Sequence, residues 1–278
     1  MPHVRDTARL RAASSLLCVP YSAMPRTPDG HPALDVAGPD QQRFQAVLFG
    51  CLMSGDPYPH EWEHPTKPAM GSIRCYLNWI IPHRDSVEIH TNTACRVASR
   101  MLPLLHRDAR ISGIPGLRLV DFGKQRLRLH HLPTGARLDL VDADGCDNRR
   151  DMGRILSLET AWHHKDNTEA LWSRRDLSRE ERAYDQHWVA APCTPLRSSL
   201  LVRVAWLVWK FWPVWKAAPP AGSYERLFST RGRSPHAAGE FLAATEARIP
   251  GASYQPRDEK EGLLTLGSAG IVLSRSAG

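Results

Sequence analysis

Residues 126–142 read R-L-R-L-H-H-L-P-T-G-A-R-L-D-L-V-D, and this stretch decides the fold because it predicts an antiparallel β-hairpin. Apolar and polar residues alternate on both sides of residues 133–135, whose proline, threonine and glycine favour a tight turn. The leucines of the two arms form the predicted buried face: Leu127, Leu129, Leu138 and Leu140. The arginines point to the opposite face: Arg126, Arg128 and Arg137. Asp139 shares that face and can offset one of their charges.

The residues before this hairpin predict a strand followed by a helix. Residues 86–90 (S-V-E-I-H) alternate as a strand does, with the valine and the isoleucine on one face. Asn92 or Thr93 can then cap a helix. The apolar residues of this helix share one side: Ala94, Val97, Ala98, Met101 and Leu105. Pro103 lies within the pattern, so we expect the helix to end or kink near it.

Further elements on both sides of this region complete an α/β pattern. Helical spacing predicts three helices: residues 41–54, 168–172 and 178–184. Ser178 with Glu181 three residues later matches a capping box, which supports the last of these. Short apolar runs predict two more strands: residues 155–158 and 188–191. Strands separated by helices are typical of an α/β layered domain, here a mixed sheet with flanking helices.

Three parts are expected along the chain. Residues 1–40 contain several prolines and glycines and little periodicity, so we expect an extended or poorly ordered arm. Residues 41–196 form the predicted α/β domain. Residues 197–278 are expected to form a Trp-rich helix and a small C-terminal subdomain. That subdomain should contain a helix at residues 237–247 and a small terminal hairpin at residues 263–273.

The stretch at residues 199–216, S-L-L-V-R-V-A-W-L-V-W-K-F-W-P-V-W-K, is the most apolar of the chain. It does not predict a transmembrane segment, because Arg203 and Lys210 interrupt it and Pro213 limits the helix. Its tryptophans recur at every third position: Trp206, Trp209, Trp212 and Trp215. On one helix they would form a broad aromatic face. Such a face packs in a core, touches a membrane surface through residues 200–215, or stacks on bases or docks a partner.

The charge balance favours an anionic partner. Lysine and arginine number 36 against 29 aspartates and glutamates, which gives a net charge of +7. Electrostatic attraction therefore makes nucleic acid, DNA above all, the expected partner. Arginines concentrate in the middle third of the chain and are the predicted nucleic-acid contacts: Arg126, Arg128, Arg137, Arg149, Arg150 and Arg154.

Familiar catalytic and metal-binding spacings are absent from the sequence. The six cysteines lie far apart with no C-x-x-C pair, so neither a zinc knuckle nor a thioredoxin-type redox site is expected. Free thiols in a reducing, cytoplasmic setting are expected instead. No H-E-x-x-H, Walker A or G-x-S-x-G sequence occurs. His130 and His131 are neighbours on a predicted strand and point to opposite faces, so they cannot share one metal site.

A series of motifs runs in a fixed order from residue 65 to residue 195. A loop, T-K-P-A-M-G-S at residues 66–72, precedes the strand, helix and hairpin described above. The run I-L-S-L-E at residues 155–159 follows, and A-P-C-T-P at residues 191–195 ends the series. In this order the motifs resemble the ATPase half of tailed-phage terminase large subunits, the viral motors that pack DNA into capsids.

The resemblance implies roles for individual residues. Phosphate is expected near three residues of the loop: Lys67, Gly71 and Ser72. Glu159 is expected to orient the attacking water, and Thr194 belongs to the motif that couples hydrolysis to movement. ATP and Mg²⁺ are the cofactors that the resemblance implies. The loop lacks the G-K-[ST] of the family, and the acidic strand lacks its metal-holding aspartate.

Two functions remain open at this point. The resemblance implies a DNA-associated, terminase-like nucleotide-binding protein, and its two incomplete motifs leave open whether it is a degenerate relative without ATPase activity. The alternative follows from the charge alone and is a non-enzymatic, basic nucleic-acid-binding or interaction protein. The sequence does not decide whether the protein is an enzyme.

Overall fold

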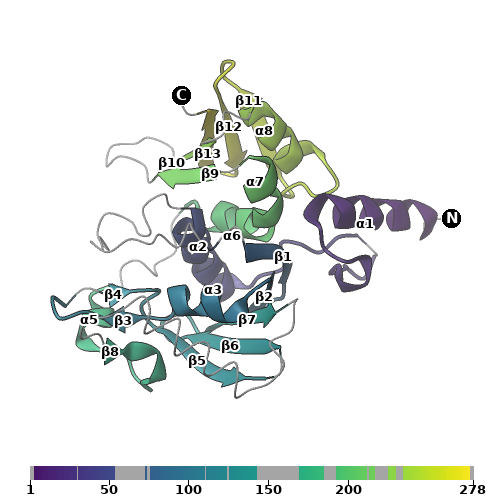
Figure 1. Ribbon diagram of the computed structural model, residues 1–278. Helices are drawn as coiled ribbons and strands as arrows, with labels where there is room; N and C mark the ends of the chain where they lie inside the picture. The colour runs from purple at the N-terminus through teal and green to yellow at the C-terminus, as the bar shows by residue number, and fades with distance from the viewer. Residues whose placement is uncertain are drawn as a thin grey trace.

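The computed structural model describes most of the chain, and the statements below concern these residues: 3–29, 31–53, 73, 76–109, 111–123, 125–142, 169–184, 192–211, 213–216, 225–229 and 234–275. The predicted strands at residues 155–158 and 188–191 lie outside this set. The described part is α/β, with a mixed five-stranded sheet flanked by helices (Figure 1). The predicted fold class is therefore confirmed.

The first sheet is built around the predicted hairpin. Its strands are β1 (Leu77–Pro82), β2 (Ser86–Thr91), β5 (Leu117–Phe122), β6 (Arg126–His131) and β7 (Ala136–Asp142). Their order is β1-β2-β7-β6-β5, in which β2 and β7 run parallel and the other neighbours run antiparallel. The predicted strand at residues 86–90 and both arms of the hairpin are confirmed.

The hairpin pairs leucine with leucine on one face. Leu127 lies opposite Leu140 and Leu129 lies opposite Leu138, and none of the four side chains is more than 2% exposed. Gly135 adopts a φ of +68° in the turn, a conformation that favours glycine. The predicted buried face is confirmed, and alternation leaves the arginines on the other face.

Helix α2 (Pro39–Met53) packs on the leucine face of this sheet and matches the helix predicted at residues 41–54. Its side chains Phe44 and Leu48 are fully buried, as the helical spacing predicts. Gln41 adds a polar tie, because its side-chain amide donates to the carbonyl of Arg137 at 3.2 Å. The side-chain oxygen of Gln41 accepts from the backbone nitrogen of Arg137 at 3.1 Å, so α2 is tied to β7 in both directions.

Helix α3 (Ala94–Met101) covers the same face and begins where the sequence predicts. The prediction that Leu105 lies on this helix is wrong, because that residue belongs to strand β3 (Leu104–Leu105). Leu102 already has extended backbone, with φ −70° and ψ 133°. Pro103 explains the end of the helix, because its ring disfavours helical backbone at the preceding residue and it has no N–H to donate.

A second five-stranded sheet is formed by the C-terminal part of the chain. Its strands are β9 (Pro213–Lys216), β10 (Glu225–Ser229), β11 (Ala252–Pro256), β12 (Glu261–Leu266) and β13 (Ala269–Arg275). Their order is β11-β12-β13-β10-β9, with β10 and β13 parallel. The predicted terminal hairpin is confirmed as β12 and β13. Helix α8 (Pro235–Ala244) packs on β11, β12 and β13 and overlaps the helix predicted at residues 237–247, starting two residues earlier and ending three residues earlier.

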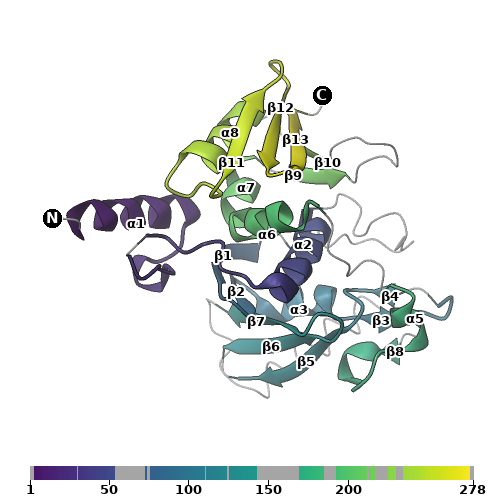
Figure 2. The same ribbon diagram turned by 180° about the vertical axis from the view of Figure 1, so that it is seen from behind.

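Helices lie between the two sheets and join them into one core. Helices α6 (Thr194–Val202) and α7 (Val204–Lys210) lie between α2 and the second sheet (Figures 1 and 2). One cluster of buried apolar residues runs from Leu10 near the N-terminus to Leu273 in β13. Residue 196, the predicted domain boundary, lies within α6, so this helix continues across it.

The prediction of one aromatic helix face at residues 199–216 is wrong. The segment is divided at Arg203 into α6 and α7 and continues as strand β9, because Pro213 cannot extend the helix. Trp206 stacks on Phe241 of α8 with ring centroids 3.7 Å apart, whereas Trp209 is 64% exposed. The leucines and valines of both helices are buried, so this stretch serves mainly as core. No helix in the described part has the length and apolar character needed to cross a membrane.

The prediction of an extended or poorly ordered arm is also wrong for the first part of the chain. Residues His3–Leu17 form helix α1, and Leu10, Ala13 and Leu17 of this helix are buried. The prolines and glycines of the arm all lie outside this helix, so nothing within it breaks the backbone pattern. Apolar residues three and four positions apart then share one buried face.

A small third sheet and two short helices complete the first half. Strands β3, β4 (Ile111–Ser112) and β8 (Glu169–Ala170) pair in the order β4-β3-β8. The helix predicted at residues 168–172 is instead β8 followed by a 3₁₀ turn at Leu171–Ser173. Helix α5 (Arg179–Arg182) is confirmed with its capping box, in which Ser178 and Glu181 exchange both hydrogen bonds.

The described cysteines carry free thiols, as predicted: Cys18, Cys51, Cys95 and Cys193. Cys51 is buried in α2, and this burial raises the pKa of its thiol to about 12. The Cys51 thiol therefore stays protonated and weakly reactive at neutral pH.

Candidate functional site

The outer face of the first sheet is the face turned away from α2 and α3, and it carries the polar positions of strands β2, β6 and β7. Side chains alternate along a strand, so Glu88 and His90 of β2 share this face with Arg126 of β6 and Asp139 of β7. Helices α2 and α3 cover the leucine face, so the outer face is occupied by charged and polar side chains.

A chain of ion pairs crosses three strands of the outer face. Arg126 donates from Nη2 to Glu88 Oε2 and from Nη1 to Asp139 Oδ2, both at 2.8 Å. Glu88 Oε1 lies 2.6 Å from Nε2 of His90, whose ring stacks on Trp79 at 4.6 Å. The hydrogen bond from His90 lowers the pKa of Glu88, burial opposes this effect, and Arg126 adds to the lowering. Two carboxylates of the same sheet, Glu88 and Asp139, therefore offset the positive charge of Arg126.

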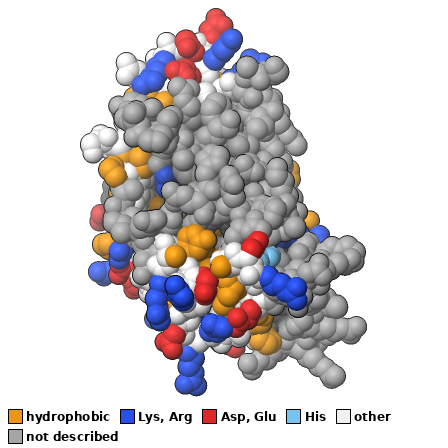
Figure 3. Space-filling model, turned by 90° about the vertical axis from the view of Figure 1, so that its left-hand side faces the viewer, with side chains coloured by type: hydrophobic (Ala, Val, Ile, Leu, Met, Phe, Trp, Pro, Cys, Tyr) orange, Lys and Arg blue, Asp and Glu red, His pale blue; other side chains and the backbone are white. Residues whose placement is uncertain are grey.

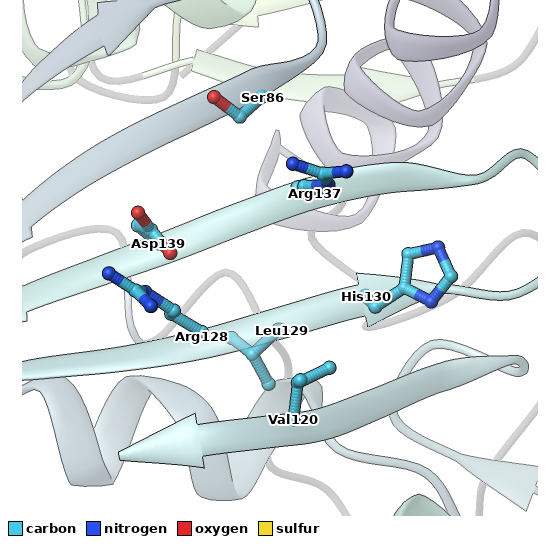
Figure 4. Close-up of a pocket in the computed structure, with 7 residues that line it drawn as sticks. All are labelled: Ser86, Val120, Arg128, Leu129, His130, Arg137 and Asp139. Atoms are coloured by element: carbon cyan, nitrogen blue, oxygen red, sulfur yellow. The ribbon is translucent and has the colours of Figure 1, made fainter. Parts of the chain in front are cut away.

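A depression of about 630 Å³ lies beside this chain of ion pairs. Its lining residues come from four strands: Ser86, Val120, Arg128, Leu129, His130, Arg137 and Asp139 (Figure 4). Arg128 and Arg137 are exposed, and neither they nor His130 have a side-chain partner among the residues that the structure describes. The depression is therefore lined by two arginines whose guanidinium groups have no described partner.

The strand register fixes where the two arginines lie relative to each other. Arg128 is opposite Asp139, and Arg137 is opposite His130. The arginines are therefore diagonal neighbours on β6 and β7, a relationship that separates them by about 7 Å. Figure 4 shows Arg128 with Asp139 toward one end of the hollow and Arg137 with His130 toward the other.

Val120 gives the depression an apolar border. The register of β5 against β6 shifts between Leu119 and Asp121, so Val120 is the extra residue of a β-bulge. Its side chain is 64% exposed, which is unusual for valine in a strand. The bulge thus places an apolar group beside the charged ones.

A buried ion pair lies on the strand next to His130. Arg118 of β5 lies opposite His130 and donates to both carboxylate oxygens of Glu181, at 2.8 and 2.7 Å. The same guanidinium donates to the carbonyls of Arg174 and Asp176 at 2.8 and 2.9 Å. Arg118 therefore fixes the segment that contains α5 against the edge of the sheet, and it is not free to bind a ligand.

The sequence-predicted site residues do not all meet in one place. Seven of them lie outside the described residues: Lys67, Gly71, Ser72, Arg149, Arg150, Arg154 and Glu159. Thr194 is the first residue of α6 and is 8% exposed. Since α6 packs on α2, on the side away from the outer face, Thr194 does not join the depression (Figure 1). Of the predicted arginines, the structure brings Arg128 and Arg137 together and engages Arg126 in ion pairs.

The sequence does not predict three of the residues that line the depression. Ser86 and His130 are outward positions of β2 and β6, and alternation alone could have placed them on the same face as the arginines. Val120 could not be found in this way, because a bulge interrupts the alternation that the prediction relies on.

Side chains of both charges lie on the outer face of the first sheet, where Arg126 pairs with Glu88 and Asp139. In the side view of Figure 3, lysine and arginine side chains alternate with aspartate and glutamate over the lower part of the molecule. The described residues contain no group of three histidines, cysteines or carboxylates arranged to hold a metal ion. The two arginines that line the depression without a described partner can each contact an anionic group locally.

No known protein family, curated protein or solved structure matches the chain. The terminase resemblance thus rests on the sequence motifs alone. Its strand, helix and hairpin are present as β2, α3 and β6–β7, whereas its loop and acidic strand lie outside the described residues.

Proposed function

We propose that the protein binds nucleic acid by contacting phosphate groups with the outer face of the first sheet. The observation that carries this proposal is the pair Arg128 and Arg137, both exposed, both without a described partner and both lining one depression. A guanidinium presents a planar fork of donors that matches the oxygens of a phosphate. His130 adds a third donor at the same end as Arg137.

The spacing of the donors favours a ligand with repeated anionic groups. Because Arg128 and Arg137 are diagonal neighbours on adjacent strands, each guanidinium can contact a separate phosphate of one strand. The net charge of +7 supports such a partner over an acidic small molecule, because it attracts a polyanion from a distance. DNA, the partner that the sequence favours, is included in this proposal.

The nucleotide-binding function implied by the terminase resemblance is a separate proposal with its own test. It depends on Lys67 and Glu159, which lie outside the described residues. Mg²⁺-dependent ATP binding by the purified chain would support it, and Lys67→Ala should then weaken binding. If the chain does not bind ATP with or without Mg²⁺, this proposal fails while the phosphate-contact proposal is unaffected.

The salt dependence of nucleic-acid binding tests the phosphate-contact proposal. The affinity should fall steeply as salt rises, because each neutralised phosphate releases counterions. The double variant Arg128→Ala/Arg137→Ala should bind more weakly and reduce the slope of log K against log salt by about two. Arg275→Ala is the matched control, because this arginine is exposed at the end of β13 in the other sheet. A flat salt dependence, or an equal slope in the double variant, would contradict the proposal.

A further inference from the structure

The depression holds a hydrogen-bond acceptor among its donors. Asp139 lines it together with Arg128 and Arg137. Asp139 Oδ2 accepts from Arg126 at 2.8 Å, and Oδ1 has no hydrogen bond to any residue that the structure describes. The ion pair with Arg126 orients this carboxylate at the edge of the depression.

A site for phosphate alone gains nothing from a carboxylate, because the two negative charges repel each other. A carboxylate next to phosphate-binding donors suits a ligand that carries a phosphate and a hydroxyl donor side by side. Ribose provides this combination, and a carboxylate that accepts from a ribose hydroxyl is a known means of recognising the sugar. The 2′-hydroxyl is also the group by which a protein distinguishes RNA from DNA.

The size and lining of the depression fit one sugar–phosphate unit. Its volume of about 630 Å³ lies within the range of pockets that hold small molecules, so it has room for a single nucleotide. The exposed side chain of Val120 offers an apolar surface to the sugar or the base. Arg137 and His130 lie toward the opposite end of the depression from Asp139, where they can bind the phosphate (Figure 4).

We infer that this depression recognises a ribose hydroxyl through Asp139, so that the protein prefers RNA to DNA of the same sequence. The inference rests on the proposed function and adds the identity of the nucleic acid to it. Asp139 selects the sugar, and Arg128 and Arg137 hold the phosphates on either side of it.

Binding of three short oligomers to the unmodified protein tests the inference without any mutation. Oligouridylate should bind on the order of tenfold more tightly than oligodeoxyuridylate at the same salt, because a hydrogen bond to a carboxylate is lost in the latter. The 2′-fluoro oligomer keeps the sugar pucker of RNA but has no hydroxyl donor, so it should bind like the deoxy oligomer. If it binds like oligouridylate, the preference comes from sugar shape and the inference is overturned.

A pair of variants then tests the role of Asp139. Asp139→Ala and Glu88→Ala each remove one of the two carboxylates that pair with Arg126, so both free positive charge on the outer face. Only Asp139→Ala also removes the acceptor, and it should abolish the difference between the ribo and deoxy oligomers. Glu88→Ala should retain that difference. Far-UV circular dichroism of both variants checks that they fold, and a difference that persists in folded Asp139→Ala overturns the inference.

The two proposals fail in different ways. Equal binding of oligouridylate and oligodeoxyuridylate, with a steep salt dependence, would overturn the ribose inference and leave the phosphate contacts in place. If both oligomers bind the unmodified protein no more tightly than they bind the variant Arg128→Ala/Arg137→Ala, the proposed function fails, and the ribose inference fails with it.

Discussion

Arg203 and Asp35 form a two-point ion pair although 168 residues separate them in the chain. Arg203 Nη1 donates to Oδ1 at 3.0 Å, and Nη2 donates to Oδ2 at 2.8 Å. The side chain of Arg203 is fully buried, and its other three N–H groups donate to the carbonyls of Ser199, Ala247 and Arg248 at 2.6 to 2.7 Å. One guanidinium thus joins the segment after α1, the junction of α6 and α7, and the loop after α8.

Loss of Asp35 should destabilise the protein strongly. Asp35→Ala leaves the Arg203 charge buried without a counter-ion, and removing one partner of a buried pair costs about 3 kcal/mol or more in the free energy of unfolding. Chemical denaturation measures this change. Asp29→Ala is the matched control, because that carboxylate is exposed in the same segment, and it should have little effect. Equal stability of the two variants would contradict the structural role of the pair.

Glu181 should be equally important for holding α5 against strand β5. Its carboxylate accepts from the backbone nitrogens of Gly116 and Ser178 at 2.7 and 2.8 Å, in addition to the two bonds from Arg118. Glu181→Gln leaves Arg118 buried without a counter-ion and should cost about 3 kcal/mol. Proteolysis should become faster at the segment around α5, since this pair fixes it to β5.

The neighbouring substitution Glu180→Gln controls for the loss of one negative charge on α5. Arg118 pairs with Glu181 and not with Glu180, so Glu180→Gln should cost far less stability than Glu181→Gln and leave the rate of cleavage nearly unchanged. If both variants behave alike, the pair of Arg118 with Glu181 does not hold this segment in place.

The elements that the sequence predicts well are those whose signal is local. Alternation over residues 126–142 is enough to define β6, β7 and their buried leucines, because the partner strand follows within one turn. The proline and glycine content of residues 1–40 as a whole does not predict helix α1, although residues 3–17 contain neither residue type. The parallel pairing of β2 with β7 has no local signal, because a long crossover separates the two strands.

The candidate site shows the same division between local and distant information. Alternation predicts Arg128 and Arg137 on one face, and that much could be derived from the hairpin alone. The engagement of Arg126 could not be derived, because its partner Glu88 lies 38 residues away and meets it only through the β2–β7 pairing. The free and the bound arginines therefore look identical in the sequence and differ only in the folded sheet.

His131 should make the stability of the protein depend on pH. It is fully buried against Phe44, and burial lowers its pKa from 6.5 to about 3. Between these two pH values the unfolded chain binds a proton that the folded chain does not, so stability falls as the pH falls. The loss due to this residue should approach 1.4 kcal/mol per pH unit, and it is absent above pH 6.5.

The contribution of His131 is measured as the difference in pH slope between the wild type and His131→Phe. The variant keeps an aromatic ring beside Phe44 but cannot titrate, so its free energy of unfolding should change less between pH 6.5 and pH 4. His83→Gln removes an exposed histidine and should retain the wild-type slope. Parallel slopes for the wild type and His131→Phe would show that His131 is not buried in its neutral form.

Gly239 contacts Tyr254, so whether replacing Gly239 raises or lowers the free energy of unfolding should depend on that tyrosine. Gly239 lies inside α8, and a Cβ at this position would overlap the ring of Tyr254 on β11. In an open helix Gly→Ala stabilises by up to about 1 kcal/mol, whereas forcing a methyl group into a packed contact costs about 2 kcal/mol. Gly239→Ala should therefore destabilise the wild type.

In the background of Tyr254→Ala, where the ring is gone, the same substitution should be neutral or stabilising. Chemical denaturation of the four proteins measures the coupling, and an equal effect in both backgrounds would show that α8 does not pack on Tyr254 in this way.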